Sequence, residues 1–243
     1  MTKPAIIAIP CLSGAPWDLQ SFAPLSDYPM ETLRLSDEHT DIESHATDVL
    51  DLASSHEKFI LLGDSFGAQV ALAAAARQPK GLAGLVISGG FAAMPVNNFV
   101  TKTKINAARF LPGPLYRHLV LPMHAKALES RFDSDGDTGW TTTDSERLFR
   151  ENTPWRGYVR RTQAALTADY RSKLRNIDVP TLILTPQDDT LIGPDAARIL
   201  REGIANSIEV VLDRTGHMFR LSHPTRYAEA IRSFLAASQQ VTA

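Results

Sequence analysis

The chain of 243 residues has a single cysteine, Cys11, so it cannot form an internal disulfide. It also has no run that approaches the roughly 18 apolar residues needed for a membrane-spanning helix. Its first apolar run, Ala5–Ile9, is too short to be the core of a secretory signal peptide. These absences favour a soluble protein of a reducing compartment, and we expect it to be cytoplasmic.

The chain also lacks an excess of charge of one sign. Lys and Arg number 25 and Asp and Glu number 27, which gives a formal net charge of −2, and both signs are mixed along the chain. No basic block is long enough to indicate a nucleic-acid partner. Apolar residues make up 44%, enough to bury a sizeable core without a metal or a disulfide. We expect a monomer or weak dimer that acts on a small molecule and not at a membrane.

Short apolar runs bounded by turn residues predict buried strands. These runs are Ala5–Ile9, Met30–Leu35, Lys58–Leu62, Leu82–Ser88, Thr181–Leu184 and Ile208–Leu212. Helical patterns lie between them, at Ile42–Ser54, Gly67–Gln78, Asp195–Glu202 and Pro224–Ala237. This alternation predicts an α/β fold in which a mostly parallel sheet is flanked by helices on both faces.

One long region interrupts the alternation. From about residue 91 to residue 175 there is no strand pattern, and four helical segments are expected instead: Lys102–Leu111, Pro114–Arg131, Thr143–Arg150 and Pro154–Leu174. We therefore predict an α/β core over residues 1–92 and 176–243, with a helical cap over residues 93–175 inserted before the strand at Thr181. An excursion of this length is usually functional.

A candidate nucleophile lies between the third predicted strand and the helix that follows it. The segment Gly63–Gly67 has the pattern Gly-x-Ser-x-Gly with Ser65 at its centre. A nucleophile on a sharp strand-to-helix turn needs small neighbours, and the helix N-terminus that follows favours developing negative charge. The alternative is an ordinary glycine-rich turn, but the strand before and the helix after favour a nucleophile.

A serine nucleophile needs a base, and the base needs an orienting carboxylate. Of the seven histidines, His217 follows a late strand in a turn-rich loop, after the serine in chain order, and we predict it to be the base. His223 stands beside Pro224, so we interpret it as a capping or surface residue. In the loop after Thr181–Leu184, either Asp188 or Asp189 could be the acid.

Acyl transfer also needs two backbone N–H groups directed at the oxyanion. Phe66 follows the nucleophile and is expected to supply one of them. We assign the other by position to Leu12, in the loop Pro10–Gly14 after the first strand. The thiol of Cys11 in the same loop is expected to be a buried structural group and not a reactive one.

The chain resembles the α/β-hydrolase superfamily over nearly its whole length. The residues that carry the resemblance are the serine turn Gly63–Gly67, the run Gln187–Asp189 and the run Gly216–Pro224. A four-helix cap makes the chain similar to its small capped esterases, including pimeloyl-carrier-protein methyl ester esterases. The resemblance implies a carboxylic ester hydrolase that needs no cofactor or metal, with Asp189 favoured over Asp188. Two features depart from the family: Pro10-Cys11 replaces the usual His-Gly, and the N-terminal hairpin is missing.

The resemblance leaves the reaction open within the family. A thioesterase, a C–C bond hydrolase or a lactone hydrolase would use the same three residues. Because proline donates no N–H, the Pro10-Cys11 departure also keeps open a non-hydrolytic ligand-binding protein or a cofactor-free lyase.

Apolar residues near the candidate triad and in the cap predict an apolar substrate pocket. We expect its walls to include Cys11, Phe91, Trp155, Met218 and Phe219. Further candidates, most of them expected to form the cap's own core, are Met94, Phe99, Phe110, Leu111, Leu115, Leu119, Met123, Leu148, Tyr158 and Val159.

Five arginines gather in the cap: Arg147, Arg150, Arg156, Arg160 and Arg161. They could dock an acyl carrier protein, as the resemblance would imply. The alternative, which we favour, is a solvated helix face, because Arg156 and Arg160 fall away from the apolar stripe of their helix.

Overall fold

The computed structural model describes residues 3–95, 99–152 and 154–241. Within these residues the strands form one six-stranded sheet in the order β2-β1-β3-β4-β5-β6, and every neighbouring pair is parallel. The strands are β1 (Ala5–Ile9), β2 (Met30–Thr32), β3 (Phe59–Asp64), β4 (Leu82–Ser88), β5 (Thr181–Pro186) and β6 (Ser207–Leu212). This sheet confirms the predicted α/β fold.

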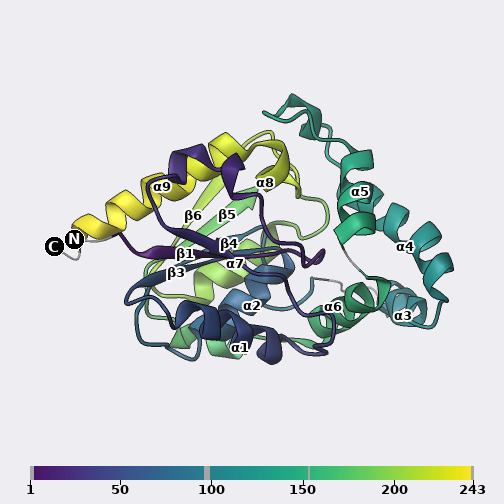
Figure 1. Cartoon of the computed structure of the whole chain (residues 1–243), viewed down its shortest axis with the longest axis horizontal. Helices are drawn as coiled ribbons and strands as arrows, with labels where there is room; N and C mark the ends of the chain where they lie inside the picture. Colours follow the sequence, from purple (N-terminus) through teal and green to yellow (C-terminus); the bar gives the residue numbers. More distant parts are fainter. Residues whose placement is uncertain (1–2, 96–98, 153, 242–243) are drawn as a thin grey trace.

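Alternate residues of the buried strands serve two separate cores. Ile7 and Leu61 pack with helices α1 (Ile42–Ala53), α2 (Phe66–Ala75) and α7 (Pro194–Gly203) on one face. On the other face, Ile6 and Ile60 pack with α9 (Pro224–Val241) and with the segment that carries Trp17, Phe22 and Leu25. Figure 1 shows α1 and α2 below the sheet and α9 above it. Successive side chains of each strand point to opposite faces, so helices or packed segments cover both faces of the sheet.

The helices between β4 and β5 lie beyond the carboxyl ends of the strands (Figure 1). They are α3 (Phe99–Ala108), α4 (Gly113–Ala127), α5 (Thr142–Asn152) and α6 (Trp155–Thr167). Tyr116, Phe149 and Tyr158 form a cluster among them that also includes Met218 from the core side. Farther along, Ala164 and Ala165 of α6 pack into the core under the sheet. The cap is therefore anchored to the core at both of these places.

Two predicted elements end earlier than expected because their backbones find other partners. After Thr32 the chain leaves the sheet, since the Leu35 N–H donates to the Gly14 carbonyl at 3.0 Å. The predicted helix Pro154–Leu174 is instead α6 followed by a 3₁₀ turn at Arg171–Asn176. The break occurs where the Tyr170 N–H donates to the Ala92 carbonyl at 2.8 Å.

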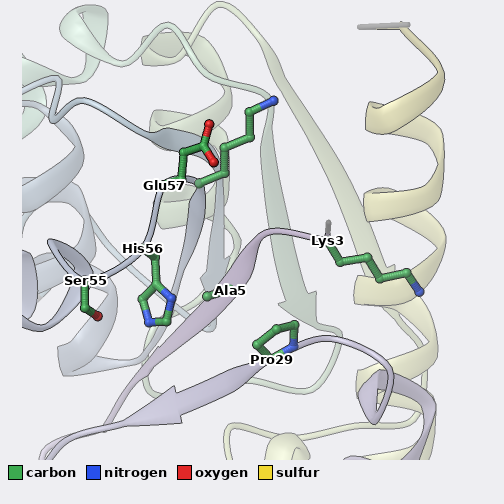
Figure 2. A pocket seen from close by; sticks show the side chains of 7 residues that line it. Lys3, Ala5, Pro29, Ser55, His56 and Glu57 are labelled. Carbon is green, nitrogen blue, oxygen red and sulfur yellow. The ribbon is translucent and has the colours of Figure 1, made fainter. Parts of the chain in front are cut away.

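A cavity of about 390 Å³ lies at the amino ends of β1 and β3, away from the cap. It is lined by Lys3, Ala5, Pro29, Ser55, His56, Glu57 and Lys58 (Figure 2). His56 is already hydrogen-bonded to the Glu31 carboxylate at 2.9 Å, and Lys3 points away towards α9, where it pairs with Asp27. His56 and Lys3 are thus engaged in structural pairs.

None of the helices in the described part of the chain is both long enough and apolar enough to span a bilayer.

Candidate active site

Ser65 occupies a strained turn between β3 and α2. Its φ of 55° and ψ of −111° are unusual for a residue with a side chain. The turn can close because Gly63 and Gly67 have no side chain. A Cβ on Gly63 would lie 2.4 Å from the Gly67 carbonyl oxygen, and a Cβ on Gly67 would lie 2.4 Å from the Ile9 carbonyl oxygen. Both glycines are therefore required by close backbone approach, as a nucleophile elbow demands.

The structure brings together Ser65, Asp189 and His217, the three residues that the sequence singled out. His217 Nε2 lies 2.9 Å from Ser65 Oγ, and His217 Nδ1 lies 2.7 Å from Asp189 Oδ2. The other Asp189 oxygen accepts from the N–H groups of Leu191 and Ile192 at 2.9 and 3.0 Å. Since the side chains of His217 and Asp189 are only 6% and 5% exposed, water competes little for these bonds.

Asp188, the alternative acid, has a different partner. Its Oδ2 accepts a hydrogen bond of 2.7 Å from the hydroxyl of Ser130, which follows α4 of the cap. Its own N–H donates to the Thr215 carbonyl at 2.9 Å. Asp188 therefore ties the acid-bearing turn to the cap and to the His217 loop, while Asp189 contacts the imidazole.

The charges of the pair shift the pKa values of both members. Burial alone would lower the pKa of His217, but the charge and hydrogen bond of Asp189 outweigh burial and raise it above its ordinary value. Burial would likewise raise the pKa of Asp189, but His217 and the N–H groups of Ile192 and Leu191 lower it. The arrangement thus favours an ionised carboxylate beside a histidine of increased basicity.

The two predicted oxyanion donors lie on neighbouring backbone segments. Phe66 is the first residue of α2, and Leu12 lies in the turn after β1, which the Gly14 N–H closes on the Cys11 carbonyl at 2.9 Å. Among the described residues neither the Phe66 nor the Leu12 N–H donates a hydrogen bond. Both residues line the same cavity as Ser65. Both N–H groups thus remain available for a ligand oxygen.

Arg161 of α6 supports this turn from the cap. Its guanidinium donates to the carbonyls of Leu12 and Ser13 at 3.0 and 3.2 Å and pairs with Asp37 at 2.9 Å. The residue is fully buried, and the approach requires a glycine at position 14, where a Cβ would lie 2.8 Å from the guanidinium carbon. The prediction of a solvated arginine face is therefore wrong for Arg161, because it binds the loop beneath the cap.

A second buried ion pair, between Asp64 and Arg220, was not found by sequence reasoning. Arg220 Nε lies 2.7 Å from Asp64 Oδ2, and the Ser88 hydroxyl donates to Asp64 Oδ1 at 3.1 Å. The guanidinium also lies over the ring of Trp17, 4.2 Å from its centroid. Asp64 precedes Ser65, and Arg220 lies in the short helix α8 (Phe219–Ser222) after His217, so the pair joins the segments that carry Ser65 and His217.

The candidate triad opens on a cavity of about 400 Å³ between core and cap. Of the five predicted pocket residues, Cys11, Phe91 and Met218 line it. Phe219 does not, because it points into the core on the α9 face of the sheet, beside Tyr227. Trp155 does not either, because it packs against Tyr116 and over Gly113. These two placements correct the prediction.

The other candidate pocket residues divide into three groups. Met94, Met123 and Tyr158 line the cavity. Leu111, Leu148 and Val159 pack within the cap, while Phe110, Leu115 and Leu119 are exposed. The side chain of Phe99 lies outside what the structure describes.

His223, which we interpreted as a capping or surface residue, caps the C-terminal end of α8 but is buried and not on the surface. It is 4% exposed, and its Nδ1 shares a hydrogen bond of 2.9 Å with the Ser222 hydroxyl. It lies between α8 and α9, where Gly136 of the cap segment packs against it. Its role is therefore to pack one loop against another.

One group of potential metal ligands is found among the described residues, and one of its members contacts Phe66. It consists of His39, His45 and Asp48, whose ligand atoms lie within 4.8 Å of one another. His39 and Asp48 already share a hydrogen bond of 2.8 Å, and His45 places its ring edge-on to Phe66. The group is not part of the cavity that contains Ser65.

Residues 10–230 match the model of the alpha/beta hydrolase family. The candidate carbamate hydrolase RutD of Stutzerimonas stutzeri is 26% identical over 204 residues, which cover 80% of this chain and 73% of that protein. The pimeloyl-[acyl-carrier protein] methyl ester esterase of Neisseria meningitidis serogroup B is 28% identical over 180 residues, 72% of this chain and 68% of that protein. These similarities confirm the resemblance predicted from the motifs.

Among solved structures, the enol-lactonase of Burkholderia xenovorans LB400 is similar with a TM-score of 0.77. The match covers 97% of this chain and 92% of that one at 21% identity, so it bears on the fold alone.

The Asp64–Arg220 pair gives a prediction for stability. Arg220→Leu leaves a buried carboxylate without its partner and should lower the free energy of unfolding by about 3–5 kcal/mol. Asp64→Asn combined with Arg220→Leu should restore part of that loss. The control Arg226→Leu removes a far more exposed pair with Asp213 and should cost about 1 kcal/mol or less. Urea denaturation measures the free energy of unfolding of the native protein and of these three variants. Equal losses for Arg220→Leu and Arg226→Leu would contradict the prediction.

Proposed function

Because the chain belongs to the alpha/beta hydrolase family, we propose that it is a serine hydrolase of carboxylic esters with an apolar acyl or alcohol portion. The observation that carries the proposal is the hydrogen-bonded series from Asp189 through His217 to Ser65 on the wall of a cavity. Such a series activates a serine for acyl transfer. The similarity to a methyl ester esterase supports an ester as the substrate.

In the proposed mechanism, Ser65 Oγ attacks the ester carbonyl carbon while His217 Nε2 accepts the hydroxyl proton. The N–H groups of Leu12 and Phe66 donate to the oxyanion that forms, and Asp189 stabilises the imidazolium. The intermediate then releases the alcohol, which takes the proton from His217 and leaves an acyl group on Ser65. Water attacks this acyl-enzyme with His217 as the base, and the carboxylic acid leaves.

The lining of the cavity supports an apolar substrate portion. Phe91, Met94, Val120, Leu128 and Met218 are among its walls, and most of the other lining residues are also apolar. A site of this volume and composition buries a small ligand by removing apolar surface from water.

The cap arginines give little support for an acyl carrier protein as partner. Arg147, Arg150 and Arg160 pair with the carboxylates of Asp144, Glu146 and Glu38. Arg161 is buried against the oxyanion loop. We therefore propose a small-molecule ester as the substrate.

The first test is covalent labelling with a fluorophosphonate. Native protein should gain the mass of one adduct, because an activated serine attacks phosphorus, and Ser65→Ala should gain none. A panel of carboxylic esters, thioesters, lactones and carbamates then compares kcat/KM among substrates that the same triad could cleave. A folded native protein that neither labels nor turns over any member would contradict the proposal and favour ligand binding without hydrolysis.

The pH profile tests the roles of His217 and Asp189. His217 must be neutral to accept a proton, and its pKa is raised, so kcat/KM should increase with pH and reach half its maximum above about pH 6.5. Asp189→Asn removes the charge that raises this pKa, so the midpoint should move to lower pH and kcat should fall by about 10⁴-fold. Equal midpoints in the two proteins would disprove the assignment.

Arg161 should act as a positioning residue for the oxyanion loop. Arg161→Met removes the donors to the Leu12 and Ser13 carbonyls, and kcat should fall about 10²-fold with a much smaller change in KM. Asp37→Asn is the matched control, because it removes the charge partner but leaves the carbonyl contacts: it should lower thermal stability and largely preserve kcat. A parallel loss of kcat and stability in both variants would reduce Arg161 to a structural role.

A further inference from the structure

The cap side of the cavity carries two polar atoms without partners. Among the described residues, Nδ1 of His124 on α4 and the hydroxyl of Tyr158 on α6 are inaccessible to solvent and have no hydrogen-bond partner. Both residues line the cavity that Ser65 and His217 also line. A buried polar atom left unpaired costs about 1–3 kcal/mol, so these two groups would gain from a ligand atom that pairs with them.

Packing holds both side chains in place. The His124 ring stacks on Phe149 at 5.2 Å between centroids, and the Tyr158 ring meets both of these rings edge-on at 5.6 Å. Leu121 and Met218 belong to the same buried cluster as Phe149 and Tyr158. Neither polar atom can find a protein partner without disrupting this packing.

Tyr116 provides the contrast within the same wall. It also lines the cavity and packs against Tyr158, but its hydroxyl is not among the buried polar atoms that lack a partner. The missing partners at His124 and Tyr158 are therefore not a general property of polar groups in this wall.

The polar pair carries no net charge. Burial, and next the proximity of His217, lower the pKa of His124 to about 4, so its ring is neutral near pH 7 and Nδ1 donates or accepts according to the tautomer. The Tyr158 hydroxyl is a neutral donor. Of the cations on the cavity wall, Arg220 is paired with Asp64, and Lys104 is exposed on α3. The chemistry of the pair favours an uncharged acceptor such as a ketone, ester or ether oxygen.

We propose that His124 and Tyr158 form a substrate subsite that binds a second, uncharged oxygen in the portion of the ester that fills the cavity. The proposal rests on the proposed function, since the ligand of the subsite is its ester substrate. It narrows the substrate class from plain aliphatic esters to esters with a further carbonyl or ether oxygen. The remaining apolar wall accommodates the chain between the two oxygens.

The test measures binding, so that it does not depend on turnover. Calorimetry on Ser65→Ala compares Kd for methyl hexanoate with Kd for its oxo analogues, which carry a ketone at each available chain position. At least one oxo ester should bind about tenfold more tightly than methyl hexanoate, because it pairs a buried donor. Adding Tyr158→Phe or His124→Leu should remove most of this preference, whereas adding Tyr116→Phe should leave it unchanged.

Three results would overturn the proposal. One is equal Kd for the plain ester and every oxo ester, and another is a preference that survives both Tyr158→Phe and His124→Leu. The third is tighter binding of the monomethyl ester of a dicarboxylic acid than of any ketone, which would assign recognition to Lys104. Failure of native protein to hydrolyse an ester that Ser65→Ala binds would count against the proposed function and not against the subsite.

Discussion

The close approach of the α2 N-terminus to the backbone after β1 is the constraint on which the candidate site depends. β1 and β3 are neighbours in register, with Ile9 opposite Gly63, so the chain leaves both strands at the same edge of the sheet. Gly67 then lets the start of α2 press against the Ile9 and Pro10 carbonyls. This contact places Leu12 beside Phe66 and fixes where Ser65 emerges. The strand order changes direction between β1 and β3, where parallel α/β sheets commonly bind ligands.

Two buried arginines connect the contact between α2 and the backbone after β1 to segments that are distant in the chain. Arg161 reaches from the cap to the turn after β1, and Arg220 reaches from the segment after His217 to the residue before Ser65. A buried guanidinium costs free energy to desolvate, and each is compensated by a carboxylate and by further hydrogen bonds or ring contact. Their effect is to hold loops in one relative position, which an apolar contact would define less sharply. The Pro10-Cys11 departure from the family pattern is compatible with this arrangement, since Arg161 holds the turn through carbonyl oxygens and leaves the Leu12 N–H unpaired.

The sequence predicted what local pattern determines. The strands and the serine turn are patterns of consecutive residues. His217 was chosen over six other histidines by chain order together with its loop after a late strand, and His223 was set aside because it stands beside Pro224. The sequence could not distinguish between adjacent residues whose side chains point in different directions. Phe219 and Met218 adjoin His217, yet one enters the core and the other the cavity. The role of Arg161 was invisible because its partners lie more than a hundred residues away, and a buried arginine looks in sequence like any other on a helix.

The core positions the candidate triad, whereas the predicted cap supplies side chains to the cavity wall, and this difference follows from their packing. The candidate triad, the turn after β1 and both arginine contacts are held by backbone approach and buried charge, so little can vary there without loss of geometry. The predicted cap contributes a large part of the cavity wall through side chains of α3, α4, α5 and α6. Its aromatic cluster meets the core near His217 at Met218. A change in His124 or Tyr158 can therefore alter which ester chain fits while leaving Ser65 and Asp189 in place. Because these two polar groups have no hydrogen-bond partner among the described residues, they are the part of the wall that we propose a bound molecule completes.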